Sequence, residues 1–366
     1  GIWYPSTGRE GLEAHHQIAT AARPGGGTGF DTSISWPLYM DLLRDELAHR
    51  PEPTVLMSSE VFSGRMTWKF LRDLKKLFAE IRIIAYLRRQ DTLIASNYNQ
   101  WVKTENLRLR LEDLRILPFD FEVMLEPWNK LLVGHTGGLV VCPYERDRLR
   151  NGSIVDDFMH SVFDLDIDCS FGRPIGQGSN PRLSLSALEY KRRVNVMCPR
   201  SIAAAFVEPL VEYSAHELLA RPETEAAIFS AQQRREILAA FAESNASVAR
   251  RYLGVEDGIL FVDDLVESDE GDAVARTRLD FRKALVISRH VAAWYLAHSE
   301  PDVRKPANEE ALRQLIRGIS WPCSALAPFL PDQAIGLLIR RLAVAFHGSF
   351  VAPTDEDIVG LRWAKS

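Results

Sequence analysis

The stretch Ile81-Arg-Ile-Ile-Ala-Tyr-Leu87-Arg88-Arg-Gln-Asp-Thr-Leu-Ile-Ala-Ser96-Asn-Tyr98 decides how the fold is predicted. Its first part, 81–87, is an apolar run that only Arg82 interrupts, and such a run predicts a buried strand of a parallel sheet. The run ends at Arg88, and a helix is predicted to begin near Gln90 or Asp91. A strand that passes directly into a helix is a basic unit of α/β proteins.

Two further apolar runs, at 54–58 and 138–142, predict additional strands. Over 65–80, apolar residues recur at helical spacing, so the order strand, helix, strand predicts a βαβ unit. Ligands of parallel sheets bind at the carboxyl ends of the strands. Four polar residues that follow predicted strands are therefore expected to meet at one edge: Ser58, Ser59, Glu60 and Arg88.

The second half of the chain is predicted to be mostly helical. The residues from Ser186 to Glu189 match a capping box at the start of a helix that reaches Met197. Gly254 is expected to close a long helix over 231–253, because glycine favours the left-handed conformation of helix C-caps. Further helices are expected at 201–220, 277–298, 308–316 and 332–346.

The composition is that of a soluble globular protein. The 366 residues are 46% hydrophobic and 25% charged, enough for a sizeable core, and the net charge of -5 gives no reason to expect nucleic-acid binding. The sequence shows neither a stretch of transmembrane length nor a signal peptide, and a cytoplasmic location is expected. The irregular spacing of the four cysteines predicts buried free thiols: Cys142, Cys169, Cys198 and Cys323.

Arg88 and Ser96 are eight positions apart and are predicted to hold a phosphate. The guanidinium at the end of the strand offers a forked, charge-assisted contact, and the serine hydroxyl offers a second donor. The N-terminus of the intervening helix adds partial positive charge. Arg89 and Asp91 are expected to shape the start of the helix and to leave the ligand to Arg88 and Ser96.

This element resembles the 3′-phosphate-binding element of sulfotransferases, which use 3′-phosphoadenosine 5′-phosphosulfate (PAPS) as sulfuryl donor. In that family an arginine after a strand and a serine eight positions later bind the same 3′-phosphate. Further segments resemble bacterial sulfotransferase-related proteins of the rhizobial type, so that the likeness extends over about 1–262. They are Gly1-Ile-Trp-Tyr-Pro5 with His15-His16, Val55-Leu-Met-Ser-Ser-Glu60, Pro143-Tyr-Glu-Arg146, Asn180-Pro-Arg-Leu-Ser184 and Glu243-Ser-Asn-Ala246.

The resemblance implies an α/β fold with a three-layer, P-loop-type parallel sheet flanked by helices and a mostly helical C-terminal half. It implies a sulfotransferase-like domain over 1–200 and a helical extension over 201–366. The activity implied is transfer of a sulfuryl group from PAPS to a carbohydrate hydroxyl, with no metal. The acceptor would be a glycan of a cell-surface polysaccharide or of lipopolysaccharide type.

One family feature is missing from this sequence. Sulfotransferases bind the 5′-phosphosulfate with a loop of the pattern Gly-x-x-(Lys/Arg)-(Ser/Thr)-Gly-(Ser/Thr), and these residues contain no such loop. The expectation is that an N-terminal strand and its loop are absent from the chain, which by itself would then not transfer sulfate. The glycine run at 25–29 lacks a preceding strand and a basic residue, so it is expected to be a surface loop.

Three residues are candidates for the base that removes the acceptor proton. Glu60 follows a predicted strand near the donor end, where a carboxylate can serve as base. His15 and His16 are the rivals, because the family likeness places a histidine close to the acceptor. In sulfotransferases a late loop also closes over the nucleotide with an arginine, and Arg182 or Arg173 is the candidate here.

Two alternatives stay open. The first is a non-catalytic relative that binds a nucleotide or a glycan, which the missing loop favours. The second is a glycosyltransferase that uses a nucleotide-sugar and a metal-binding Asp-x-Asp pair. Asp164, Asp166 and Asp168 match that pattern formally, but the stretch around them is acidic and apolar and a chance match is expected.

Overall fold

The protein is a mixed α/β chain in which helices predominate and the strands are parallel. The structure, a computed structural model, describes residues 1–9, 14–23, 34–64, 68–114, 119–167, 180–222, 225–262, 279–298, 313 and 331–347. The chain divides into two compact units, each built from separate segments. Unit 1 contains 1–88, 118–167 and 241–263, and unit 2 contains 89–117, 168–240 and 264–366. The predicted boundary near 200 falls within unit 2, and the two-domain division stays a prediction.

Unit 1 carries all four described strands. Its elements in chain order are β1 (Ile2–Trp3), α1 (His16–Ala21), α2 (Trp36–Ala48), β2 (Thr54–Val55), η1 (Glu60–Ser63), α3 (Trp68–Leu77), β3 (Glu80–Leu87), α5 (Phe121–Leu132), β4 (Thr136–Pro143), η3 (Arg150–Gly152), α6 (Ile154–Phe163), α11 (Ala242–Val248) and η5 (Ala249–Leu253). β1 pairs with β2 and β3 pairs with β4, each in parallel. The three predicted strands are confirmed, with β2 shorter than expected.

The prediction that the strands at 54–58 and 81–87 pair as one βαβ unit is not met among the described residues. β2 takes β1 as its neighbour and β3 takes β4, so the described strands form two small sheets. β3 is also less buried than predicted, since only Leu87 at its end is fully buried. A strand with a described partner on one side only keeps its other edge and part of its side chains accessible.

The core of unit 1 lies where four helices meet. Phe70 of α3 packs against the rings of Trp36 from α2 and Trp128 from α5, at centroid separations of 4.9 and 6.4 Å. Ile18 of α1 joins the same cluster. The Trp36 indole donates to the buried carboxylate of Asp73 over 3.1 Å, so the polar atom of the ring is paired inside the core.

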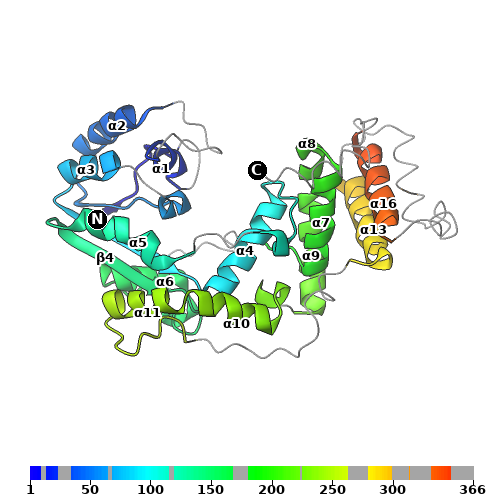
Figure 1. The fold of residues 1–366 in the computed structure, drawn as a ribbon. Coiled ribbons are helices and arrows are strands. Elements are labelled where there is room, and N and C mark those ends of the chain that lie inside the picture. Colours follow the sequence, from blue (N-terminus) through cyan, green and yellow to red (C-terminus); the bar gives the residue numbers. More distant parts are fainter. Residues whose placement is uncertain are drawn as a thin grey trace. The chain divides into compact units, whose positions relative to one another are not determined.

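All described secondary-structure elements of unit 2 are helices. Its elements are α4 (Gln90–Lys103), η2 (Leu111–Asp113), α7 (Leu185–Met197), α8 (Arg200–Ala204), α9 (Val207–Ala220), η4 (Glu225–Ile228), α10 (Ala231–Ala240), α13 (Phe281–His298) and α16 (Pro331–His347). α7 packs against α4, α9, α13 and α16, and α7 and α9 run side by side in Figure 1. Buried Tyr190 of α7 and Ser288 of α13 share a hydrogen bond of 2.8 Å.

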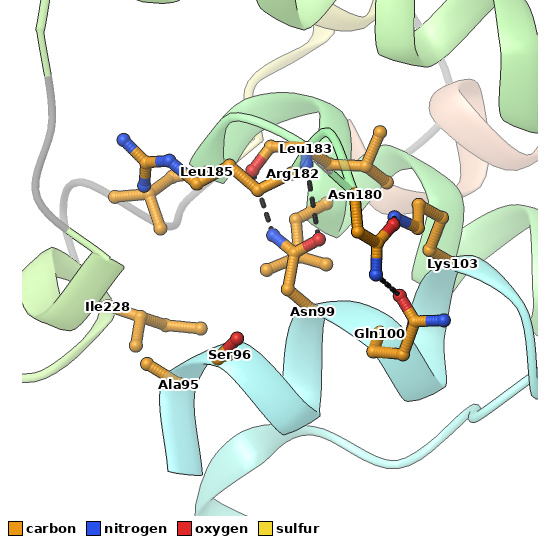
Figure 2. Close-up of a pocket in the computed structure, with 11 residues that line it drawn as sticks. Ala95, Ser96, Asn99, Gln100, Lys103, Asn180, Arg182, Leu183, Leu185 and Ile228 are labelled. Atoms are coloured by element: carbon orange, nitrogen blue, oxygen red, sulfur yellow. Dashed lines mark hydrogen bonds between the residues drawn. The ribbon is translucent and has the colours of Figure 1, made fainter. Parts of the chain in front are cut away.

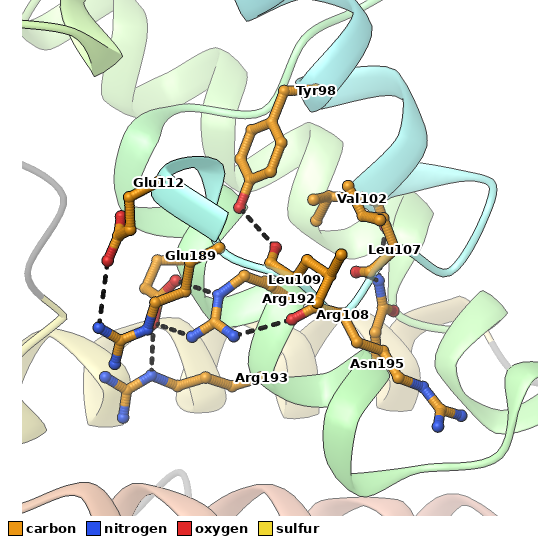
Figure 3. Close-up of polar contacts among 11 residues, drawn as sticks. Tyr98, Val102, Leu107, Arg108, Leu109, Glu112, Glu189, Arg192, Arg193 and Asn195 are labelled. Atoms are coloured by element: carbon orange, nitrogen blue, oxygen red, sulfur yellow. Dashed lines mark hydrogen bonds and ion pairs between the residues drawn. The ribbon is translucent and has the colours of Figure 1, made fainter. Parts of the chain in front are cut away.

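A polar network ties α7 to the segment that follows α4 (Figure 3). Glu189 accepts two hydrogen bonds of 2.7 Å from Arg192, which also donates to the Arg108 carbonyl. Asn195 is fully buried and donates to the carbonyls of Val102 and Leu107. Buried polar groups need such partners, and here the α7 side chains satisfy backbone carbonyls that no helix pairs.

Two helix predictions need correction in detail. Ser184, rather than Ser186, caps α7 by accepting from the Ala187 N–H, and the hydroxyls of both serines donate to Glu217. The long helix predicted over 231–253 is broken into α10, α11 and the π-helical turn η5. The predicted C-cap is confirmed, since Gly254 adopts a left-handed conformation with φ of 67°.

Several predictions fall outside the described residues: the glycine run at 25–29, Arg173, Asp168 and most of the helix at 308–316. Of the cysteines, Cys142 and Cys198 are confirmed as buried free thiols. Within the described part of the chain, none of the helices is both long and apolar enough to cross a bilayer.

Candidate functional site

From Ser96 to its C-terminal end, α4 has a polar face. Ser96, Asn99, Gln100 and Lys103 follow one another at intervals that place them on the same side of a helix. A helix face that meets the core is normally apolar. These polar residues face a second segment of unit 2, the turn at 180–183 that leads into α7.

The α4 face holds this turn through side-chain hydrogen bonds (Figure 2). The Asn99 amide donates to the Leu183 carbonyl over 2.8 Å and accepts from the Leu183 N–H over 3.1 Å. Gln100 accepts from the Asn180 amide over 2.7 Å. The Lys103 ammonium donates to the Asn180 side-chain oxygen and, over 2.8 Å, to the Pro181 carbonyl. The turn therefore has a fixed position relative to α4.

Between α4 and the turn lies a small pocket that is partly open to solvent. Its polar lining residues are Ser96, Asn99, Gln100, Lys103, Asn180 and Arg182. Its apolar lining residues are Ala95, Leu183, Leu185, Leu188 and Ile228. Among the described residues, the lining carries two cationic side chains and no carboxylate. A pocket of this composition favours an anion with an apolar part.

The pocket brings together two residues that the sequence analysis predicted as nucleotide ligands, Ser96 and Arg182. The Ser96 hydroxyl has no hydrogen-bond partner among the described residues, so it can donate to a ligand. Asn99, Gln100 and Lys103 were missed. Their common signal is the spacing of polar residues along one helix face.

Arg88 lies directly after β3, as predicted. Its guanidinium carbon lies 5.8 Å from the ring centre of Tyr144, which follows the neighbouring strand β4. Both residues belong to unit 1, whereas Ser96 belongs to unit 2. That Arg88 and Ser96 hold one phosphate together stays a prediction.

The start of α4 is fixed by a buried ion-pair cluster. Asp91 is fully buried and accepts from Arg89 over 2.9 Å and from Arg234 of α10 over 2.8 Å. It also accepts from the N–H of Thr92 over 2.8 Å. These contacts agree with the expectation that Arg89 and Asp91 shape the helix start.

His15 links the loop after β1 to the segment after β2 in unit 1. Its Nδ1 accepts from the Ser58 N–H over 3.2 Å, which leaves the proton on Nε2, and Nε2 donates to the Pro5 carbonyl over 3.2 Å. Burial lowers the pKa of His15 to about 4. Both ring nitrogens are thus engaged with backbone groups, and in this arrangement His15 offers neither to a substrate.

His16 and Glu60 lie close to the same segment. His16 begins α1, and its Nδ1 lies 2.9 Å from the hydroxyl of Ser59, which caps η1. Glu60 is the first residue of η1 and is exposed. The Ser58 hydroxyl next to them is within hydrogen-bonding distance, 3.0 Å, of the hydroxyl of Tyr4. The carboxyl side of β2 in unit 1 therefore carries several groups that can bind hydroxyl ligands.

Two aspartates of the Asp-x-Asp pattern, Asp164 and Asp166, have structural roles in unit 1. Asp164 ends α6 in a left-handed conformation, and Asp166 pairs with Arg150 over 2.7 Å. Asp166 also lies 3.2 Å from His160. Over the described residues, no group of three or more histidine, cysteine, aspartate or glutamate side chains is arranged to hold a metal ion.

The fold and the pocket define a mixed α/β protein with a cationic pocket in its helical unit. No protein-family model matches the chain, and no solved structure matches it. A protein of Archaeoglobus fulgidus, described as an uncharacterized protein, is 28% identical to this chain over 218 residues. The match covers 58% of this chain and 57% of the archaeal protein, so the chain spans somewhat more than half the length of this curated relative.

Proposed function

We propose that this chain is a sulfotransferase-like protein that binds the 3′-phosphate of PAPS and serves the transfer of its sulfuryl group to a carbohydrate hydroxyl. The observation that supports this most is the shared pocket of Ser96 and Arg182. Each was predicted as a nucleotide ligand from a different segment of the sequence. The proposed fold is a three-layer P-loop-type sheet to which the pairs β1–β2 and β3–β4 both belong.

The pocket's composition fits a nucleoside phosphate. Ser96, Lys103 and Arg182 offer hydrogen-bond donors, two of them charged, and charge-assisted contacts of this kind are the stronger ones. Leu185, Leu188 and Ile228 offer an apolar wall for a ribose or a base. In this proposal Arg88 adds a further guanidinium from the end of β3.

The proposed reaction is an in-line displacement at sulfur. The acceptor hydroxyl oxygen attacks the sulfur, the bond from sulfur to the 5′-phosphate oxygen breaks, and 3′-phosphoadenosine 5′-phosphate leaves. A base takes the proton of the acceptor hydroxyl. His16 and Glu60 are the candidates for this role, since both ring nitrogens of His15 are engaged. The chain lacks the 5′-phosphosulfate loop pattern, so nucleotide binding is the direct test.

The test is calorimetric titration of the protein with 3′-phosphoadenosine 5′-phosphate and with adenosine 5′-phosphate, which lacks the 3′-phosphate. We expect Arg88→Ala, Ser96→Ala and Arg182→Ala each to weaken binding of the bisphosphate about tenfold or more, because each removes a hydrogen bond to a charged group. Binding of the monophosphate should change little.

Arg235→Ala is the matched control, because Arg235 is exposed on α10 in the same unit and does not line the pocket. It should bind the bisphosphate as the unaltered protein does. Equal affinity of the unaltered protein for the two nucleotides would contradict the proposal. Any sulfuryl transfer to a glycan should persist in a metal chelator, and loss of transfer there would favour the metal-dependent alternative.

A further inference from the structure

Lys103 combines burial with an ammonium group that has no anionic partner among the described residues. Only 5% of the residue is exposed. Its two acceptors, the Asn180 side-chain oxygen and the Pro181 carbonyl, are both neutral. No carboxylate of the described residues pairs with it. A buried lysine normally has a paired charge, because removing an ammonium from water is costly.

The surroundings of Lys103 prepare it for a ligand. An ammonium has three donors, and two of them are used by the turn at 180–183. Asn180 is itself oriented by Gln100, which accepts from its amide nitrogen, so the acceptor oxygen is directed at Lys103. The result is a positioned cation in the lining of the pocket.

The other lining residues add to the positive electrostatic potential of the pocket. Arg182 carries a second cationic group, Ser96 supplies a hydroxyl, and no described lining residue is a carboxylate. A ligand with a tetrahedral oxyanion would supply a counter-charge to the Lys103 ammonium and would accept a hydrogen bond from it.

We infer that Lys103 is a ligand-binding residue of this pocket and that it takes a tetrahedral oxyanion, a phosphate or sulfate ester, as its missing counter-charge. This inference rests on the proposed function only for the identity of the ligand, the 3′-phosphate of the nucleotide. The contacts with Asn180 and Pro181 hold the ammonium in place, and the oxyanion accepts from its remaining N–H.

The test compares Lys103→Met, which keeps most of the stem and removes the charge, with Lys103→Arg, which keeps the charge. We expect Lys103→Met to weaken binding of 3′-phosphoadenosine 5′-phosphate tenfold to about a hundredfold, with most of that loss restored in Lys103→Arg. Binding of adenosine 5′-phosphate should stay within about threefold, because it lacks the 3′-phosphate. Lys130→Met, which removes a surface lysine of α5 in unit 1, should bind both nucleotides normally.

A purely structural role predicts a different pattern. Asn99→Ala removes two hydrogen bonds to the turn and no charge. If Lys103 acts only by holding the turn, Asn99→Ala and Lys103→Met should weaken both nucleotides to the same extent, and that result would overturn the inference. The inference is supported if Lys103→Met weakens binding of the bisphosphate only and Asn99→Ala does not have this effect.

Inorganic phosphate separates this inference from the proposed function. Phosphate should raise the melting temperature of the protein more than sodium chloride of equal ionic strength does, and this effect should disappear in Lys103→Met. That result supports an anion site at Lys103. If the protein shows it but does not bind the nucleotide, the proposed function alone is overturned. Bisphosphate binding that depends on Arg88 and Ser96 and is unchanged in Lys103→Met would overturn the inference alone. If neither stabilisation by phosphate nor binding of the bisphosphate depends on Lys103, the inference is overturned.

Discussion

The buried carboxylate of Asp91 joins two segments of unit 2 that are far apart in the sequence. It pairs with Arg89 next to it and with Arg234, which lies 143 positions away in sequence. Two guanidinium groups meet one buried carboxylate. Removal of one partner from such a cluster is destabilising because it leaves buried charge uncompensated.

His15 makes the stability of the protein depend on pH. Its pKa in the folded protein is about 4 because burial disfavours the charged ring, whereas the ordinary value is 6.5. Between these values the unfolded chain binds a proton that the folded protein does not. The free energy of unfolding should therefore fall as the pH falls from 6.5 to 4, by about 3 kcal/mol in total.

The measurement is chemical denaturation of the unaltered protein and of His15→Gln at about pH 7 and about pH 4.5, a range in which His15 contributes to the change. The variant should lose clearly less stability between the two values, because glutamine does not titrate. His49→Gln, at an exposed residue, should behave as the unaltered protein. Equal losses in all three proteins would refute the role given to His15.

Among the secondary-structure elements, the pair β3–β4 depends on one glycine. Gly137 of β4 pairs with Ile81 of β3 and has a φ of 117°. A Cβ atom at Gly137 would lie 2.0 Å from the Ile81 carbonyl oxygen. Its neighbour Gly138 has no atom within 4 Å of such a Cβ and no positive φ. Of these two adjacent glycines, only Gly137 is required by the backbone conformation and the close approach of β3.

Gly137→Ala should accordingly lower the free energy of unfolding by about 2 kcal/mol or more, through backbone strain and displacement of the β3 carbonyl. Gly138→Ala is the control and should change it by less than about 0.5 kcal/mol, as substitutions in open surroundings do. Urea denaturation of both variants measures the difference. Similar values for the two would show that the close approach of β4 to β3 is incorrect.

Each of the two units is built from segments that are separate in the sequence. The chain passes from one unit to the other at five places: 88/89, 117/118, 167/168, 240/241 and 263/264. Segment 241–263 is held in unit 1 by contacts such as Ser244 to Asp120, 2.6 Å, and Arg251 to Glu126, 2.9 Å. Neither unit can therefore be assembled from one continuous piece of chain.

Because of these crossings, we expect the two units to unfold together. Hydrogen–deuterium exchange in increasing urea should show peptides from α5 in unit 1 and from α7 in unit 2 losing protection at the same midpoint. A single cooperative transition is the behaviour of chains whose parts cannot fold separately. Two midpoints separated beyond experimental error would show that the units are independent despite the shared chain.

The sequence by itself determined the local features of this protein. The apolar runs located the strands β3 and β4, the positions of Phe70 and Leu74 located the buried face of α3, and Gly254 marked the end of its helix. The junction of β3 and α4 with Arg88 at its start was also predicted. These features depend on the periodicity and chemistry of neighbouring residues, which a sequence displays directly.

Only the tertiary structure decided which segments meet. It paired β3 with β4 and β2 with β1, broke the helix predicted over 231–253, and brought the turn at 180–183 onto α4. The residues of the pocket thus come from α4, the turn, α7 and η4, and no periodicity within one segment shows that they are neighbours. Such contacts arise from chain segments far apart in sequence that bury and pair one another's polar groups. This is why only the tertiary structure placed Lys103 in the lining of a pocket.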